Sequence, residues 1–265
     1  MTITATPPMG TAKPRPAITR DRYHRYTHEG IVHPGVTSLL KIVDKSDALM
    51  GWAARNTAEA ALRLLGGLPE LLATVGPEGV VKALTARSGW QRDEAAAAGS
   101  DIHGHAERIA RGEEVAEGID RIIRERVLRY AEWWSGAGWR VRLAEAFIVN
   151  VDLGYGGTID LLAYDEAGRT TLADVKSGKG AYAETRLQLA AYGMAGLIAP
   201  QGSPVVWPMP HVERYVVLHV TDEGVRVIDV DVDDDDRAAF RACIPLSRWR
   251  ASRGRDRLSG HGASA

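Results

Sequence analysis

The sequence predicts a mixed α/β fold, in which a mixed β-sheet is flanked by helices and preceded by a helical N-terminal region. Three observations carry this prediction. Residues 36–139 show mainly helical periodicity, and residues 140–180 alternate between apolar and polar side chains as strands do. The chain then continues as a helix, two strands and a last helix. Such interchange of strands and helices is typical of a sheet covered by helices.

Composition limits the classes of protein and of site. The chain has 265 residues, of which 45% are hydrophobic, enough for one substantial core. The formal net charge of -1 provides no overall basic field, so a polyanion would have to bind a local patch. The single cysteine, Cys243, excludes an internal disulfide and a four-cysteine zinc or iron–sulfur site, and it fits a reducing cytoplasm. We find no apolar run long enough for a membrane helix and expect no membrane partner.

The part of the chain before the sheet divides into an arm and several helices. Prolines and small polar residues predict a flexible arm over residues 1–20, followed by a mainly helical region over residues 21–139. Thr37 or Ser38 can cap the first helix, and "DALMGWAARNTAEAALRLL" has apolar residues at helical spacing. "PEGVVKALTA" predicts a short helix with Pro77 in its first turn. Further helices are expected over residues 92–112 and 118–138.

The remaining elements form the expected core over residues 140–250. Strands are predicted over residues 141–150, 156–164 and 170–177, then a helix over residues 182–198 and strands over residues 213–221 and 224–232. The acidic run from Asp231 to Asp236 suits the N-terminus of the last helix, where the helix dipole favours negative charge. Residues 251–265 are expected to be a basic, disordered tail.

The second and third strands of the core are predicted to form a hairpin that pairs two carboxylates. If the turn "YDEAGR" is centred on Ala167, Asp160 lies directly opposite Asp174, with Cβ atoms roughly 4.5–5.5 Å apart. Lys176 then shares their face. The apolar neighbours point to the core: Ile159, Leu161, Ala173 and Val175. A divalent cation such as Mg²⁺ or Mn²⁺ would relieve the repulsion. The alternative is a solvated surface hairpin with Lys176 as an ion-pair partner.

Two predicted helices also carry polar pairs four residues apart, which share one helix face. His103 and Glu107 form the first pair. A neutral imidazole can bind a divalent metal, although a capping or surface histidine and an exposed glutamate are the alternatives. Gln188 and Tyr192 form the second pair and make a polar spot on an otherwise apolar helix. The alternative is an amphipathic boundary with a locally satisfied hydroxyl.

Four motifs in order give the sequence a family resemblance. They are G-x-x-x-H at Gly99–His103, G-x-x-D at Gly157–Asp160, D-x-K at Asp174–Lys176 and Q-x-x-x-Y at Gln188–Tyr192. Over residues 95–196 this arrangement resembles the PD-(D/E)XK nuclease superfamily, and in particular the RecB-type branch that includes CRISPR-associated and phage recombination exonucleases. The segment "HPGVTSLL" also resembles the opening of phage-encoded members. Ile159 stands where the superfamily name has proline.

The resemblance implies a restriction-endonuclease-like fold and a stand-alone, metal-dependent DNA exonuclease of the phage recombination type. Its implied catalytic residues are Asp160, Asp174 and Lys176. The implied Mg²⁺ or Mn²⁺ ligands are His103, Asp160, Asp174 and the backbone carbonyl of Val175, and supporting roles fall to Glu107, Glu145, Gln188 and Tyr192. No iron–sulfur cluster is expected, because the cysteines of cluster-bearing relatives are absent. The alternatives are a catalytically silent DNA-binding module of this fold and an α/β interaction protein with a chance hairpin.

Candidate DNA contacts lie in three places. The arm and its sequel carry a basic run that can track a phosphate backbone or serve solubility: Lys13, Arg15, Arg20, Arg22 and Arg25, with Tyr23 and Tyr26 between them. Ser177 and Lys179 follow the motif lysine, where backbone N–H groups and an ammonium group could meet a phosphate, or simply form the turn into the next helix. Arg248 and Arg250 belong to an arginine-rich stretch over residues 237–257, whose alternative role is solubility. DNA is thus the expected partner, with a single-strand annealing or recombination protein as a second one. The expected location is the cytoplasm of a bacterium or a phage-infected host cell, and the oligomeric state is left open.

Overall fold

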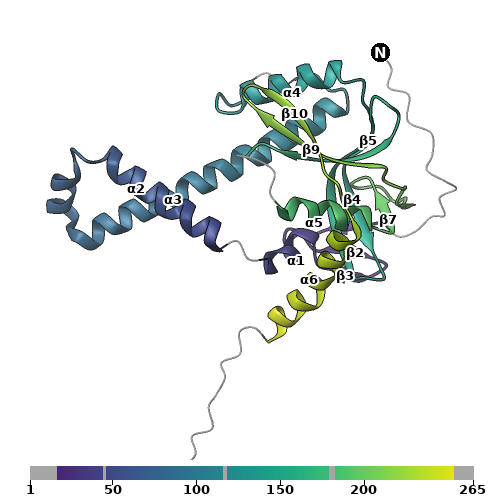
Figure 1. The fold of residues 1–265 in the computed structure, drawn as a ribbon, viewed down its shortest axis with the longest axis horizontal. Helices are drawn as coiled ribbons and strands as arrows, with labels where there is room; N and C mark the ends of the chain where they lie inside the picture. The colour runs from purple at the N-terminus through teal and green to yellow at the C-terminus, as the bar shows by residue number, and fades with distance from the viewer. Residues whose placement is uncertain (1–16, 44–45, 116–117, 179–182, 254–265) are drawn as a thin grey trace, which may run out of the picture.

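A seven-stranded mixed β-sheet forms the centre of the protein, in the order β10-β9-β6-β5-β4-β7-β8 (Figure 1). The computed structural model describes residues 17–43, 46–115, 118–178 and 183–253. The predicted α/β class, with a mixed sheet flanked by helices, is confirmed. The strands of this sheet are β4 (Arg140–Asn150), β5 (Tyr155–Tyr164), β6 (Thr170–Lys176), β7 (Leu197–Ala199), β8 (Trp207–Pro208), β9 (Arg214–Thr221) and β10 (Gly224–Asp229).

The central hairpin has the register that the sequence predicts. Strands β5 and β6 pair Leu161 with Ala173 and Tyr164 with Thr170, so continuing this register places Asp160 across from Asp174. At the turn, Gly168 has a φ of 79°, a conformation that glycine adopts at little cost. After β6 the chain passes through α5 (Ala183–Gly193), β7 and β8 before it reaches β9, which pairs with β6 in parallel.

Helices cover both faces of the sheet (Figure 1). On what we call the α5 face, α1 (Val36–Leu39), the 3₁₀ helix η1 (Leu40–Ile42), α5 and α6 (Asp234–Ser252) pack on a core that includes Leu162, Leu172, Leu189 and Phe240. On the opposite α3 face, the end of α3 (Leu68–Ala110) and α4 (Arg124–Gly136) pack on a core that includes Ile102, Val127, Tyr130, Leu161 and Ala173. Because both faces are covered, most residues of β5 and β6 are buried whichever face they point to.

The helix α2 (Ser46–Arg63) and the first part of α3 form a hairpin that projects from the sheet (Figure 1). The α3 segment is two helices joined at Gly76, whose φ of 70° and ψ of 174° are not helical. Pro77 begins the second helix, as its position in the sequence predicts. The C-terminal end of that helix packs against the sheet through Ile102 and Ala106, and this packing brings His103 to the strands.

A small three-stranded sheet precedes the helices and was not predicted. Its strands are β1 (Thr19–Arg20), β2 (Tyr26–His28) and β3 (Ile31–His33). They are two or three residues long, too short for a periodicity of two to be recognised. The ring of Tyr26 packs on Gly156 of β5, where a Cβ atom would come within 2.5 Å of Tyr26. This contact holds the small sheet against the edge of the predicted site.

The predicted arm and tail lie mostly outside the described residues, whereas the start of the last helix is described. Most of the predicted arm, residues 1–16, and most of the predicted tail, residues 254–265, lie outside the described residues. Helix α6 begins with a capping box, in which the Asp233 side chain accepts from the Asp236 amide and Asp236 accepts from the Asp233 amide. The expectation that the acidic run starts the last helix is confirmed. Among the described residues, no helix is both long and apolar enough to cross a bilayer.

Candidate metal centre

Three carboxylates lie side by side on three neighbouring strands. The β4–β5 register pairs Ala144 with Leu161 and Ala146 with Ile159, which places Glu145 across from Asp160. On its other side Asp160 faces Asp174 of β6. Like charges directly opposed across a sheet are destabilising. The fold therefore assembles an acidic row whose repulsion a cation would relieve.

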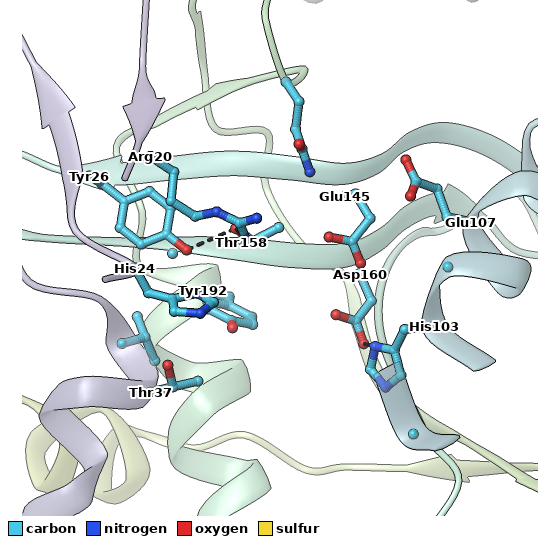
Figure 2. Close-up of a pocket in the computed structure, with 15 residues that line it drawn as sticks. Arg20, His24, Tyr26, Thr37, His103, Glu107, Glu145, Thr158, Asp160 and Tyr192 are labelled. Atoms are coloured by element: carbon cyan, nitrogen blue, oxygen red, sulfur yellow. Dashed lines mark hydrogen bonds and ion pairs between the residues drawn. The ribbon is translucent and has the colours of Figure 1, made fainter. Parts of the chain in front are cut away.

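Strands β4 and β5 change faces at the acidic row. Residues two apart in a regular strand share a face, yet Ala144 packs on the α3 face and Ala146 on the α5 face. Leu161 and Ile159 differ in the same way, so the prediction that these two share a core face is wrong. The physical reason is a left-handed residue inside β4: Glu145 has a φ of 49°. This break directs Glu145 and Asp160 into a cavity in place of the core (Figure 2).

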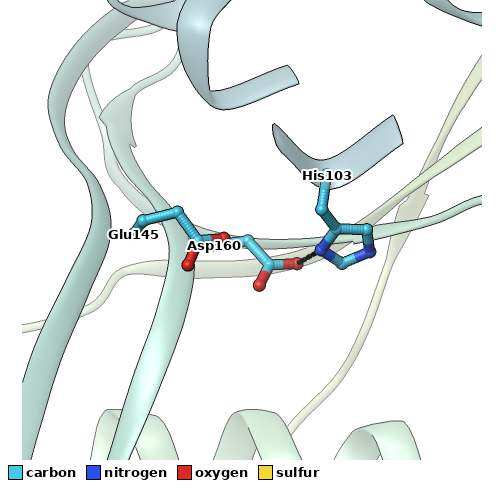
Figure 3. A group of neighbouring side chains, drawn as sticks. All are labelled: His103, Glu145 and Asp160. Carbon is cyan, nitrogen blue, oxygen red and sulfur yellow. Dashed lines mark ion pairs between the residues drawn. The ribbon is translucent and has the colours of Figure 1, made fainter. Parts of the chain in front are cut away.

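His103 completes a cluster of metal-binding groups with Glu145 and Asp160 (Figure 3). Its Nδ1 lies 3.3 Å from Asp160 Oδ2, and one ligand atom from each of the three residues lies within 4.8 Å of the other two. Carboxylate oxygens suit Mg²⁺ and Mn²⁺, and imidazole widens the choice to other divalent metals. The sequence placed His103 and Asp160 here, but it gave Glu145 only a supporting role.

Asp160 is the centre of the site's hydrogen bonds and charges. Its Oδ2 accepts a 2.7 Å hydrogen bond from the Val175 amide. Burial acts to raise the pKa of Asp160, but His103, Lys176 and the Val175 amide outweigh it and lower that pKa. Burial acts to lower the pKa of His103, and the Asp160 carboxylate more than compensates and raises it. Val175 thus reaches the site through its N–H group, while the role of its carbonyl stays a prediction.

Asp174 is held by the lysine and glutamine of the sequence motifs. Its side chain is 1% exposed, Lys176 Nζ lies 2.9 Å from Oδ1 and 2.7 Å from Oδ2, and Gln188 Nε2 donates to Oδ1 at 3.1 Å. Burial and the Asp160 charge raise the pKa of Asp174 to about 6. The Oδ2 atom is buried and makes no hydrogen bond, because the contact with Lys176 is an ion pair without hydrogen-bond geometry.

The donor set of the cluster fits a hard divalent cation. Its two carboxylates and one imidazole match the ligands of such an ion. The buried Oδ2 atom of Asp174 makes no hydrogen bond, but the Lys176 ammonium group 2.7 Å away already balances its charge. His103, Glu145 and Asp160 would hold the ion, and Asp174 lies across from Asp160 on the next strand.

Tyr192 explains the glycine of the G-x-x-D motif. A Cβ atom on Gly157 would come within 2.8 Å of the Tyr192 ring, so only glycine lets the ring pack there without a shift. The Tyr192 hydroxyl accepts from Gln188 Nε2 at 3.0 Å, and Gln188 bonds Asp174 in turn. The two residues of the Q-x-x-x-Y motif therefore act as one support for Asp174.

Lys176 carries a positive charge beside the acidic row. Burial acts to lower its pKa, but Asp174 and Asp160 outweigh burial and raise it. The ammonium group therefore stays protonated at neutral pH in the metal-free protein. It can stabilise developing negative charge, whereas it is poorly suited to accept a proton.

The cavity in front of the cluster has an acidic side and a cationic, hydroxyl-bearing side (Figure 2). Its volume is about 730 Å³. Across from the carboxylates, Arg20 Nη1 donates to Thr158 Oγ1 at 3.3 Å, and the Tyr26 hydroxyl lies 2.8 Å from the same oxygen. Thr158 was not predicted, and Arg20 and Tyr26 were expected only as part of a basic run that can track a phosphate backbone, not beside the metal-binding cluster. The glycine pair before Thr158, on which Tyr26 and Tyr192 pack, is the signal that could have indicated them.

The remaining predicted site residues lie around this centre. Glu107 lines the cavity and forms an ion pair with Arg111 at 2.7 Å. Ser177 accepts a 3.3 Å hydrogen bond from Arg126 through its carbonyl. Lys179 lies outside the described residues.

The two predicted DNA-binding arginines of α6 bond backbone carbonyls. Arg248 donates to Leu153 and Gly154, and Arg250 donates to Lys41. Both arginines are nevertheless exposed. These bonds attach α6 to the turn before β5 and to η1, and a DNA contact of either arginine stays a prediction.

The acidic row should make the metal-free protein less stable as the pH rises. Burial, Asp160 and Glu107 raise the pKa of Glu145 from 4.5 to about 7. The folded protein therefore keeps a proton that the unfolded chain has lost, and the free energy of unfolding falls between about pH 4.5 and pH 7. The variant Glu145→Gln cannot ionise. In EDTA the free energy of unfolding of this variant should equal that of wild type at pH 5. At pH 8 it should be higher than that of wild type by on the order of 1–3 kcal/mol.

Urea unfolding at the two pH values measures this difference. Glu59→Gln, at an exposed position of α2, is the control and should show the same difference from wild type at both pH values. If Glu145→Gln is as stable as wild type at pH 8, or less stable, ionisation of Glu145 in the acidic row does not destabilise the folded protein.

Comparisons of the chain with protein-family models and with curated proteins found no significant match. The geometry of the cluster and the order of the motifs are therefore what indicate a function. Together they describe a half-buried cluster of His103, Glu145 and Asp160 that lines a cavity with a cationic far side. The buried Asp174 and the protonated Lys176 lie beside Asp160 and are not among the residues that line the cavity.

Proposed function

We propose that this protein is a divalent-metal-dependent DNA nuclease of the PD-(D/E)XK type, acting as a stand-alone exonuclease. The observation that carries the proposal is the convergence of Glu145, Asp160 and Asp174, from three neighbouring strands, with His103 and the protonated Lys176. Two carboxylates on adjacent strands and a lysine two residues after the second are the features of the motif resemblance. A catalytically silent DNA-binding module would not need these carboxylates or this lysine, so their presence favours an active enzyme.

His103, Glu145 and Asp160 would hold Mg²⁺ or Mn²⁺, with Asp174 beside them. A bound ion of this kind polarises a phosphoryl oxygen and lowers the pKa of a coordinated water. The protein's own contribution is to fix these groups. The Val175 amide orients Asp160, and Gln188 together with Lys176 orients Asp174.

The proposed reaction is hydrolysis of a phosphodiester bond. A water oxygen attacks phosphorus as the bond from phosphorus to the 3′ oxygen breaks, which leaves a 5′-phosphate and a 3′-hydroxyl. Negative charge grows on the phosphoryl oxygens, and the Lys176 ammonium group would stabilise it. On the far side of the cavity, Arg20 and the hydroxyls of Tyr26 and Thr158 are groups that bind phosphate, which supports an anionic polymer as the substrate.

Cleavage of end-labelled DNA with and without metal tests the proposal. EDTA should abolish degradation of linear DNA, and added Mg²⁺ or Mn²⁺ should restore it, because the acidic row cannot act on phosphate without a cation. Closed-circular DNA of the same sequence should survive, since an exonuclease needs an end. Equal degradation in EDTA would contradict the metal mechanism, and cleavage of the circle would assign an endonuclease. Binding of DNA without cleavage under every condition would favour the silent module.

A further inference from the structure

A single arginine connects the last turn of α3 to the break in β4. Arg111 Nη2 lies 2.7 Å from Glu107 Oε1 and donates a 3.1 Å hydrogen bond to the carbonyl of Ala144. That carbonyl belongs to the peptide unit between Ala144 and Glu145. The guanidinium group is therefore bonded to the backbone that leads directly into the residue at the break.

The backbone at Glu145 requires such support. Its φ of 49° lies in the left-handed region, which residues with a Cβ atom seldom adopt. Among the described residues, the other two non-glycine residues with positive φ, His24 and Glu29, lie outside the strands. Glu145 instead lies inside an eleven-residue strand. A sparsely populated conformation in such a place persists only where neighbouring groups fix it.

We propose that Arg111 is a positioning residue for the metal centre. Its guanidinium holds the peptide unit between Ala144 and Glu145 in the orientation that gives Glu145 its left-handed conformation. This conformation aims the Glu145 carboxylate at Asp160 and His103. The Glu107 carboxylate orients the arginine in turn. The effect on metal binding rests on the proposed function, whereas the effect on the backbone rests on the geometry alone.

The competing explanation is that Arg111 forms an ordinary surface ion pair. Arg108 provides a matched comparison on the same turn of α3. Its Nε lies 2.7 Å from Glu113 Oε2 and its side chain is 46% exposed, against 2.7 Å and 45% for Arg111 with Glu107. Replacing either arginine with methionine removes one ion pair and keeps the apolar part of the side chain. The hydrogen bond to the Ala144 carbonyl is specific to Arg111.

A thermal double-mutant cycle in EDTA tests the effect on the backbone without any metal. Glycine adopts a positive φ at little cost, so Glu145→Gly removes the need for support. Arg111→Met should lower the melting temperature of the wild-type chain, and most of this loss should disappear in the Glu145→Gly background. Arg108→Met should cause the same shift in both backgrounds. An equal loss from Arg111→Met in both backgrounds would overturn the proposal.

Titration of the full chain with Mn²⁺ tests the effect on the metal centre. Loss of a group that orients a ligand typically weakens metal affinity by about 10- to 100-fold, so we expect at least a tenfold higher dissociation constant for Arg111→Met. Arg108→Met should bind Mn²⁺ as wild type does. Wild-type affinity in Arg111→Met would overturn the positioning role. If the wild-type chain binds no Mn²⁺, the proposed function fails, and the cycle in EDTA still decides whether Arg111 holds the peptide.

Discussion

Lys176→Met should lower the rate of DNA cleavage by about 10²–10³, the usual contribution of one positioned charge in a site of this type. Methionine keeps the length and the apolar contacts of the lysine and removes only the ammonium group. That group lies 2.7 Å from Asp174 Oδ2 and stays protonated, so its loss removes the positive charge that we propose stabilises the attacked phosphate. Single-turnover degradation of end-labelled linear DNA at saturating Mn²⁺ measures the rate.

The same variant should still fold and bind DNA, because one ammonium group is a small share of the phosphate contacts. Lys82→Met, at an exposed position of the projecting hairpin, is the matched control and should cleave at the wild-type rate. If Lys176→Met and wild type degrade DNA equally fast, Lys176 is only an ion-pair partner of Asp174. The proposed mechanism would then lack the side-chain positive charge that stabilises the attacked phosphate.

Asp160→Asn should abolish both Mn²⁺ binding and cleavage. Asp160 is the carboxylate that faces all the others, and it also contacts His103 and the Val175 amide. The amide keeps the shape of the side chain but carries no negative charge. A divalent cation requires that charge in its ligand. Because a bound metal ion contributes several kcal/mol to such a transition state, the rate should fall by at least about 10³-fold.

Isothermal titration with Mn²⁺ and the labelled-DNA assay should agree for this variant. Asp152→Asn, at an exposed position in the turn before β5, is the control and should behave as wild type in both. Mn²⁺ binding of wild-type affinity in Asp160→Asn would place the metal elsewhere. If Asp160→Asn loses Mn²⁺ binding but still cleaves DNA, the acidic row is not required for the cleavage reaction.

The local features of this site could be predicted from the sequence because they depend on short spacings. One turn sets the register of the hairpin, so the pairing of Asp160 with Asp174 follows from the position of that turn. The pairing of Gln188 with Tyr192 follows from one turn of helix. The class of the fold follows from the order of strands and helices.

The features that could not be predicted depend on contacts between distant segments or on an unusual backbone. Glutamate disfavours a positive φ, so nothing in the sequence around Glu145 indicates that β4 breaks there and turns this side chain into the cluster. Thr158 meets Arg20 and Tyr26 across more than 130 residues of chain, through strands too short to recognise. The specific restriction-endonuclease-like fold and the nuclease activity stay predictions.

The mechanism depends most on the claim that His103, Glu145 and Asp160 hold one divalent ion, and anomalous X-ray scattering tests it directly. Crystals of the protein soaked with Mn²⁺ would be measured on both sides of the manganese absorption edge. The account predicts a single strong anomalous peak among the His103 imidazole and the Glu145 and Asp160 carboxylates, next to Asp174. A peak at another place, or none at this cluster in crystals fully soaked with Mn²⁺, would contradict it.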